Sequence, residues 1–365
     1  MTIVKLYGGL GNQLFQYSTA YAFTKRRKDI LFIDISWFKQ NFKGLTKREF
    51  LLDKFYVDYK IANKIQIKET KKNILKDPQN FHFNKIDYEK KENIYLDGYW
   101  QSFKYFDVFK DDIKKMFIYK DKFPDKLNQL LNIIKKQNSL GIHIRRGDYF
   151  NNYNAYIRHG VLKIEYYQKA LEYIRNLNIN IDSIYIFSDD IEWCKKEFLF
   201  DFKKIEFINT GIDLIDFVLL INCKHKIIAN SSFSWWCAYL GDENGIVIAP
   251  GNWLRNEKIN FKDFFLDNWI IISLPFETKE EYYSDVINYL FEKIKLLNIK
   301  EIPKLKYNKQ IYLLVQDIKD CYNKIFLDKE ITTFKRNEFI NLLFKILTHY
   351  KYADLNVFYN ILKKI

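Results

Sequence analysis

The sequence has 365 residues, of which 48% are hydrophobic, with only 12 glycines and 5 prolines. This length allows two packed domains, and the composition excludes a collagenous or disordered chain. The formal net charge of +14 indicates attraction to nucleic acid, anionic lipid or a phosphorylated small molecule, although the composition bias of an AT-rich genome would produce the same basicity.

The chain begins with the pattern of a βαβ unit. Residues 3–7 form a short apolar run that predicts a strand, and a glycine-rich turn follows at 8–11. A helix is expected over residues 12–27 and a second strand over 30–35. From about residue 40 to 135 the pattern is weaker and indicates mixed short elements.

Five lysines recur at every fourth residue within this weaker region: Lys60, Lys64, Lys68, Lys72 and Lys76. On a helix this spacing predicts one basic stripe. A solvated helix face is our main interpretation, and contact with a membrane surface is the alternative.

From residue 139 onward, apolar strands and helices alternate regularly, which favours a parallel sheet covered on both faces. Strands are predicted at 140–144, 183–187, 205–209, 226–229 and 245–249. Helices are predicted at 163–176, 190–198, 213–223 and 232–240. Sheets of this kind bind ligands outside the carboxyl ends of their strands, where the strand order reverses.

After about residue 275 the pattern changes to helices alone, with Leu314, Ile318, Cys321 and Ile325 at helical spacing. We therefore predict three parts: an N-terminal α/β domain at 1–135, a second α/β domain at 136–275 and an α-helical extension at 276–365.

The cysteines show no CxxC pair and no paired spacing with histidine, so neither a disulfide framework nor a zinc site is expected. The chain enters a strand pattern without a charged leader, and no apolar run approaches the roughly 20 residues that span a bilayer. We expect a cytoplasmic protein, with a peripheral position on the inner face of the membrane as an alternative.

Three polar clusters follow predicted strands of the second half, where this fold binds ligands. They are His143, Arg145, Arg146 and Asp148; Ser188, Asp189 and Asp190; and Asn230, Ser231, Ser232, Phe233 and Ser234. A guanidinium group can donate two parallel hydrogen bonds to phosphate oxygens. The last cluster lies at the start of a predicted helix, where free backbone N–H groups can bind an anion. Together they predict a nucleotide site, with the diphosphate between the arginines and the helix start.

Each cluster also has a structural interpretation. The acidic cluster and the serines fit simple helix caps, and the two arginines could pair with the acids after them. Residues 147–149 are expected to form a loop.

The N-terminal glycine turn begins like a dinucleotide fingerprint, but Leu14 stands where the third glycine belongs, so the match is weak. Asn12 and Gln13, at the start of the predicted helix, are better interpreted as polar groups offered into a cleft.

Five motifs appear in order: GGLGNQLFQY at 8–17, GYWQSFKYF at 98–106, HIRRGDY at 143–149, FSDD at 187–190 and NSSFSWWCAYL at 230–240. In this set the chain resembles the bacterial α-1,2-fucosyltransferases over roughly residues 1–270. The resemblance implies an α/β, GT-B-like fold, with two Rossmann-like domains facing a cleft.

The implied activity is transfer of fucose, with inversion, from GDP-L-fucose to the 2-hydroxyl of a galactose. No cofactor or metal is implied. The implied acceptor is a galactose-containing oligosaccharide or a lipid-linked glycan, as in surface polysaccharide or lipopolysaccharide biosynthesis.

The resemblance also implies roles for individual residues. Arg145 or Arg146 would bind the diphosphate, with Arg145 favoured, and Asn12 would lie near the fucose and the acceptor. The other donor-binding residues would be His143, Asp148, Ser188, Asp189, Asp190, Asn230, Ser231, Ser232, Phe233 and Ser234. Acceptor-side residues would be Gly11, Gln13, Tyr99, Trp100 and Gln101.

No spacing selects a general base among Asp148, His159 and Glu165. Two other functions remain as alternatives. A transferase for another nucleotide sugar or linkage would share all of these motifs. A nucleic-acid-binding protein would need a basic face with interleaved exposed aromatics, and the sequence shows none, so no nucleic-acid partner is expected.

Overall fold

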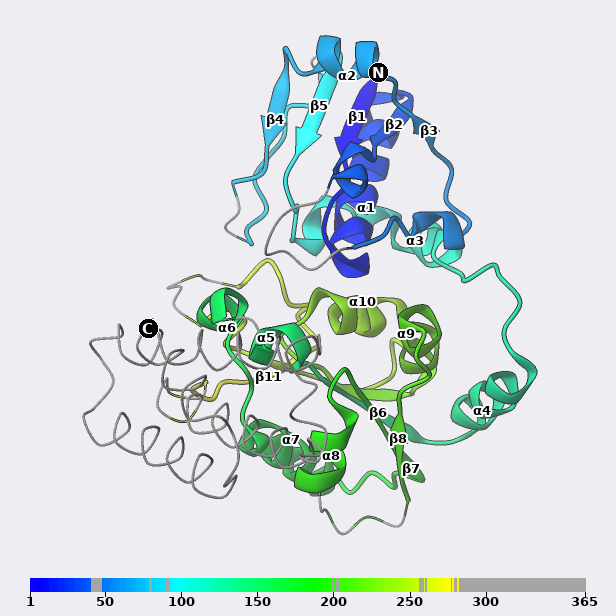
Figure 1. The fold of residues 1–365 in the computed structure, drawn as a ribbon, viewed down its shortest axis with the longest axis vertical. Coiled ribbons are helices and arrows are strands. Elements are labelled where there is room, and N and C mark those ends of the chain that lie inside the picture. Colours follow the sequence, from blue (N-terminus) through cyan, green and yellow to red (C-terminus); the bar gives the residue numbers. More distant parts are fainter. Residues whose placement is uncertain are drawn as a thin grey trace, which may run out of the picture. The chain divides into compact units, whose positions relative to one another are not determined.

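The structure is a computed structural model. It describes residues 1–276 except 41–47, 79–80, 90–91, 152, 199, 201, 203, 256–258 and 260, together with residues 278 and 281. The chain divides into two compact units, residues 1–276 and 277–365. The first unit contains two sheets (Figure 1). The helical extension predicted for 276–365 lies outside the described residues, apart from 276, 278 and 281.

The first sheet has the strand order β3-β2-β1-β5-β4, and its described pairs are all parallel. Its strands are β1 (Thr2–Lys5), β2 (Leu31–Asp34), β3 (Lys60–Ile61), β4 (Ile74–Lys76) and β5 (Ile94–Asp97). The helices of this half are α1 (Leu10–Arg27), α2 (Lys64–Thr70) and α3 (Lys110–Met116). Helix α4 (Asp125–Lys136) follows them in the chain and packs against residues 213–222 of the second half. Short 3-10 helices lie at Ser36–Lys39, Leu52–Lys54, Phe103–Tyr105 and Asp107–Phe109.

Alternating side chains of the first sheet enter different cores, as the two-residue period of a strand requires. Val4 packs in the core that contains α1, whereas its neighbour Ile3 packs with Tyr95 on the other side. The predicted βαβ start of the chain is confirmed, because β1 and β2 pair in parallel and α1 connects them.

The predicted single helix under the lysine stripe is wrong. Lys60 lies in β3 and Lys76 in β4, so only Lys64 and Lys68 are on a helix, α2. Asn63 and Gln66 form a capping box that starts α2 after the short strand. A period of four among lysines does not specify a helix where no apolar stripe accompanies it.

The second sheet has the order β11-β10-β9-β6-β7-β8, again with parallel pairs. Its strands are β6 (Ser139–Ile144), β7 (Ser183–Ser188), β8 (Ile205–Ile208), β9 (His225–Ile227), β10 (Val247–Pro250) and β11 (Ile270–Ile272). Its helices are α5 (Gly147–Asn151), α6 (Tyr153–His159), α7 (Ile164–Asn176), α8 (Ile191–Glu197), α9 (Asp213–Asn222) and α10 (Ser232–Leu240).

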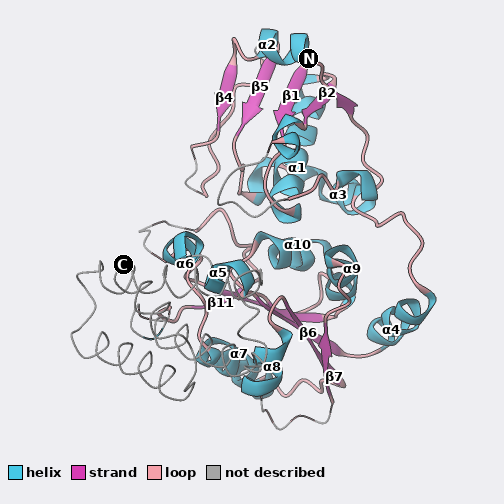
Figure 2. Ribbon diagram, in the orientation of Figure 1, coloured by secondary structure: helices cyan, strands magenta, loops and turns pink. Residues whose placement is uncertain are grey.

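Helices cover both faces of the second sheet (Figure 2). Ile184 and Ile186 of β7 pack in the core with α7 and α8, whereas Tyr185 and Phe187 pack in the core with α9 and α10. The predicted alternation of strands and helices is confirmed. The loop expected at 147–149 is wrong, because these residues form the start of α5, which begins at Gly147.

Aromatic side chains join the two halves of the first unit. Phe15 of α1 packs against Trp235 and Trp236 of α10, with ring centroids 4.4 and 5.0 Å apart. All three side chains are fully buried. The start of α1 is thereby held beside the start of α10.

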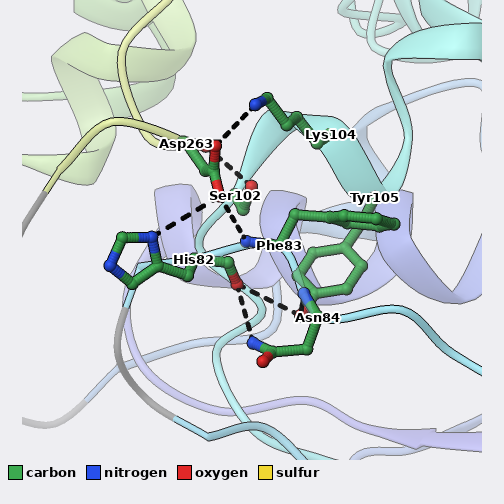
Figure 3. A network of polar contacts seen from close by, with 7 residues as sticks. All are labelled: His82, Phe83, Asn84, Ser102, Lys104, Tyr105 and Asp263. Carbon is green, nitrogen blue, oxygen red and sulfur yellow. Dashed lines mark hydrogen bonds and ion pairs between the residues drawn. The ribbon is translucent and has the colours of Figure 1, made fainter.

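A polar network around Asp263 adds a second link between the halves (Figure 3). Lys104 donates to one carboxylate oxygen of Asp263 at 2.5 Å, and the Phe83 N–H donates to the other at 3.1 Å. The Ser102 hydroxyl donates to the Asp263 carbonyl oxygen at 2.7 Å, and His82 lies 3.5 Å from the carboxylate.

Two parallel sheets flanked by helices confirm the expected fold class, α/β and GT-B-like. No helix in the described ranges has both the length and the apolar character to cross a membrane.

Candidate active site

The three polar clusters of the second half lie at the carboxyl ends of the neighbouring strands β9, β6 and β7, and the switch point lies between β6 and β9. The chain leaves these two strands toward opposite faces, since α7 after β6 and α10 after β9 belong to different cores. This is the switch point at which open parallel sheets bind ligands.

Arg145 follows β6 and keeps a partly exposed side chain, with 22% of its surface accessible. Its guanidinium donates to Asp148 at 2.6 Å and lies 2.9 Å from a carboxylate oxygen of Asp189. Burial opposes the charge, but the two carboxylates outweigh it and raise the pKa of Arg145 above its usual value. A fixed, always charged guanidinium therefore lies at the switch point.

Arg146 takes a different position, with only 3% of its side chain exposed. Its guanidinium lies over the rings of Trp193 and Phe150, at 4.0 and 4.7 Å from their centroids, and its Nε donates to Asp190 at 3.2 Å. Arg146 is thus packed inside the domain, whereas Arg145 keeps part of its side chain accessible, which favours Arg145 as the ligand-facing arginine.

The Ser188–Asp190 cluster is engaged within the protein. The Ser188 hydroxyl accepts from the Asp190 N–H at 2.9 Å, and Asp190 caps α8 by accepting from the Trp193 N–H at 3.4 Å. Asp189 accepts from the Arg146 N–H at 2.9 Å. For the acidic cluster, the contacts therefore show helix capping and pairing with the arginines, the two structural interpretations that the sequence allowed.

The start of α10 has the open geometry that suits an anion. Ser231 is the N-cap residue but makes no side-chain cap bond, and no acid lies in the first turn. Among the described residues, the N–H groups of Ser232, Phe233 and Ser234 have no partner, because the first intrahelical bond runs from Trp235 to Ser231. The half-buried Ser232 side chain lies at this open end.

Asn230 and Ser234 support this helix start from inside. Asn230 Nδ2 donates to the His159 carbonyl oxygen at 2.9 Å, and the Ser234 hydroxyl donates to carbonyl oxygens of Ala229 and Ser231 at 3.3 and 3.2 Å. Both side chains are buried. Their polar groups fix the loop, and Ser232 and Phe233 are the members of the cluster with partly exposed side chains.

His143 and Phe233 form a stacked pair, with ring centroids 5.3 Å apart and planes 29° apart. Burial, followed by the charge of Arg145, lowers the pKa of His143 to about 3. The imidazole is therefore neutral, and its Nδ1 has no hydrogen-bond partner in the described chain.

The first half contributes the start of α1. Gly11 lies against Ser232, so close that a β-carbon at Gly11 would overlap the Ser232 carbonyl group. Asn12 accepts a hydrogen bond from Gln101 Nε2 at 3.0 Å. The structure therefore brings together the predicted residues Gly11, Asn12 and Gln101 beside the α10 start.

Gln13 and Trp100 do not join them. Gln13 is fully buried; its amide donates to the Gly8 and Glu49 carbonyl oxygens and accepts from the Leu51 N–H. Trp100 is also buried, in a turn with φ of +57°. Both expectations are corrected, since neither side chain is offered to a ligand.

Arg48 is a residue of this region that the sequence analysis missed. It lies 2.8 Å from Asp148, which therefore accepts from two guanidiniums, Arg48 and Arg145. Nothing in the spacing around residue 48 marks it.

Tyr149 and His159 form a second stacked pair, with ring centroids 4.4 Å apart and planes 6° apart, and Arg145 lies over the Tyr149 ring at 5.4 Å. Burial lowers the pKa of His159 to about 4. The third candidate for a base, Glu165, is exposed in the first turn of α7.

The described residues contain no group of three or more histidine, cysteine, aspartate or glutamate side chains placed to hold a metal ion.

A family model described as Glycosyl transferase family 11 matches residues 1–273. The chain belongs to glycosyl transferase family 11. The open helix start and the outward Arg145 thus lie in the part of the chain that the family model covers.

Curated relatives of this family 11 chain are bacterial and mammalian. An alpha-1,2-colitosyltransferase of Escherichia coli is 33% identical over 296 residues, 74% of this chain and 99% of that protein. The O-antigen biosynthesis glycosyltransferase WbnK of Escherichia coli is 32% identical over 73% of this chain and 98% of that protein. The mouse galactoside 2-alpha-L-fucosyltransferase Sec1 is 25% identical over 68% of this chain and 67% of that protein.

Solved structures of fucosyltransferases also match. The NodZ alpha-1,6-fucosyltransferase soaked with GDP-fucose is 13% identical, with a TM-score of 0.39 over 66% of this chain and 92% of that one. POFUT1 in complex with GDP is 10% identical, with a TM-score of 0.40 over 67% of this chain and 97% of that one.

Proposed function

We propose that this family 11 glycosyltransferase moves L-fucose from GDP-β-L-fucose to the 2-hydroxyl of a terminal β-galactoside, with inversion, in the synthesis of a surface polysaccharide or lipopolysaccharide. The observation that carries the proposal is the pairing of an outward guanidinium, Arg145, with the open start of α10 at one switch point. The relatives' named activities support the sugar class and the linkage.

The chemistry of the transfer explains why these groups are needed. Cleavage of the sugar–phosphate bond places new negative charge on the departing GDP while the sugar becomes oxocarbenium-like. Arg145 and the N–H groups of Ser232 and Phe233 are fixed in place before the reaction, so they stabilise that charge in the transition state more than in the ground state. The mechanism that we propose requires no metal.

Several contacts keep the proposed diphosphate site in position. Asp148 and Asp189 orient the Arg145 guanidinium, and Asn230 and Ser234 hold the loop that opens α10. His143 stacks against Phe233 as a neutral ring, so it adds no charge beside the phosphates. We propose that the stacked His143–Phe233 pair lies beside the guanosine.

Colitose is the alternative donor sugar, favoured by the 33% identity to an alpha-1,2-colitosyltransferase. Colitose is fucose without the 3-hydroxyl. A site that hydrogen-bonds this hydroxyl would discriminate strongly against the deoxy sugar, whereas a site that accepts colitose need not exclude fucose by much.

The test is a transfer assay with GDP-fucose and GDP-colitose against a panel of β-galactosides, with the product linkage determined by NMR. We expect a new α-1,2 bond with GDP-fucose, formed equally well after treatment with EDTA. A product linked elsewhere, transfer from GDP-colitose alone or a strict requirement for manganese would contradict the proposal.

A further inference from the structure

Three aromatic side chains lie at the carboxyl edge of the first sheet, and the proposed mechanism does not use them. Tyr7 follows β1, Trp37 follows β2 and Tyr99 follows β5. The Tyr7 ring lies 4.8 Å from that of Tyr99 and 6.4 Å from that of Trp37, between centroids. We call these three residues the aromatic edge.

The strand order explains why the three rings meet. β1 lies between β2 and β5, and both pairs are parallel, so the three carboxyl ends are neighbours at one edge. Open parallel sheets bind ligands outside this edge. All three side chains are only half-buried, although large rings in this chain are often fully buried.

The aromatic edge is continuous with the proposed transfer site. Tyr99 is two residues from Gln101, whose amide donates to Asn12, and Asn12 follows the Gly11 that lies against Ser232. Tyr7 is held by its N–H, which donates to Gln16 at 3.0 Å.

The second half also approaches the aromatic edge. Burial raises the pKa of Tyr99, and the positive charge of Arg158 acts against that shift, so this guanidinium lies within electrostatic reach of the phenol. Arg158 is adjacent to His159, which stacks on Tyr149 beside Arg145.

We propose that the aromatic edge is the acceptor subsite, where the apolar face of the galactoside packs into the corner that the tilted rings of Trp37, Tyr7 and Tyr99 form. This inference rests on the proposed function. A β-galactoside carries its C3, C4 and C5 hydrogens on one side, which gives it an apolar face that fits the negative faces of aromatic rings. Its hydroxyls would bond the Asn12 and Gln101 amides and the Lys5–Asp97 pair, whose charged atoms are 3.3 Å apart.

Steady-state kinetics with varied donor and varied acceptor test the inference. Trp37→Leu and Tyr99→Leu remove a ring, whereas Trp37→Phe and Tyr99→Phe keep one. Tyr56→Leu is the matched control, because Tyr56 is an aromatic residue of the same half with 60% of its surface exposed. We expect each leucine variant to raise the acceptor KM about tenfold or more, with the donor KM within about twofold of wild type. The phenylalanine variants should stay within about threefold of wild type.

An acceptor KM equal to that of Tyr56→Leu would overturn the inference, and so would a rise in the donor KM alone, which would assign the rings to the nucleotide sugar. Should a leucine variant fail to fold, saturation-transfer NMR of methyl β-galactoside on the wild-type protein with GDP decides. Transfer from aromatic protons that is strongest at H3, H4 and H5 is expected, and a uniform pattern would contradict stacking. Failure of wild type to bind GDP or to cleave GDP-fucose would instead defeat the proposed function itself.

Discussion

Gly11 of α1 and Ser232 of α10 lie in direct backbone contact, so that a β-carbon on Gly11 would be only 2.5 Å from the Ser232 carbonyl oxygen. The contact sets the spacing between the half that carries Asn12 and the helix start proposed to hold the diphosphate. Neither helix has a side-chain cap or an acid in its first turn. The positive ends of two helix dipoles are thus placed together, which favours an anion between them.

Gly11→Ala should therefore impair transfer. Backbone atoms cannot rotate away as a side chain can, so the helix starts must separate, and a misplacement of about 1 Å can cost about 100-fold in rate. Gly9→Ala is the matched control, because a β-carbon at Gly9 would meet no atom within 4 Å and the φ of Gly9 is −74°. We expect kcat/KM to fall at least tenfold for Gly11→Ala and to stay near wild type for Gly9→Ala. Equal values for the two variants would show that the contact does not set the geometry.

Arg146 should be a stability residue. Arg146→Ala removes a buried guanidinium that lies over two rings and deprives Asp190 of its ion-pair partner, so we expect the free energy of unfolding to fall by at least about 2 kcal/mol. The control Arg175→Ala, at an exposed position of α7, should change it by less than about 0.5 kcal/mol. Denaturant unfolding measures both. A normal stability with lost GDP affinity would mean that Arg146 binds the ligand directly.

The neutral His143 predicts a pH dependence of stability. The unfolded chain takes up this proton below about pH 6.5, whereas burial delays protonation of the native imidazole to about pH 3. The folded protein therefore has its full stability with respect to this ring above pH 6.5. Protonation of His143 in the unfolded chain lowers the free energy of unfolding progressively as the pH falls toward 3. Between about pH 7.5 and pH 5 the loss is about 2 kcal/mol. His143→Phe cannot be protonated and should lose about 2 kcal/mol less over this range; an identical pH dependence in both proteins would contradict the buried neutral ring.

Asp263 should stabilise the contact between the two halves. Burial raises the pKa of its carboxyl, but Lys104, the Phe83 N–H and His82 outweigh this and lower it overall. The stabilisation is thus present above the usual pKa of about 3.9 and is lost as the pH falls below it. Asp263→Asn should cost about 1 kcal/mol near neutral pH and less in acid. The control is Asp121→Asn, because Asp121 forms an exposed ion pair with Lys54; we expect its free energy of unfolding to change by less than about 0.5 kcal/mol. Equal losses of stability in the two variants would mean that the Asp263 network does not stabilise the fold.

Much of the second sheet could be predicted because each strand is an apolar run that ends in polar residues. β6 and β7 show this most clearly, and both are buried over their whole length. The strands β3 and β11 could not be predicted in this way, because they have two or three residues and include exposed positions. Tertiary pairing, which no local pattern carries, defines them.

The site was predicted at the level of its clusters but not of each side chain. Arg145 and Arg146 are adjacent where the chain leaves β6, yet their exposed fractions are 22% and 3%; this difference comes from the Trp193 and Phe150 rings over Arg146, which no local pattern reveals. Gln13 is one helical position from Asn12, about 100° around the axis, and that rotation buries it. Trp100 turns inward because the Asp77 carboxylate accepts from its N–H and that of Tyr99, which holds the positive φ.

Calorimetric titration of GDP into the intact protein tests the central claim most directly. If Arg145 and the start of α10 hold the diphosphate, wild type and Arg175→Ala should bind GDP equally. Arg145→Ala should bind it about 10- to 100-fold more weakly, since one charge-assisted hydrogen bond is worth about 1.5–3 kcal/mol. No heat of GDP binding in the wild-type protein, or an unchanged affinity in Arg145→Ala, would contradict it.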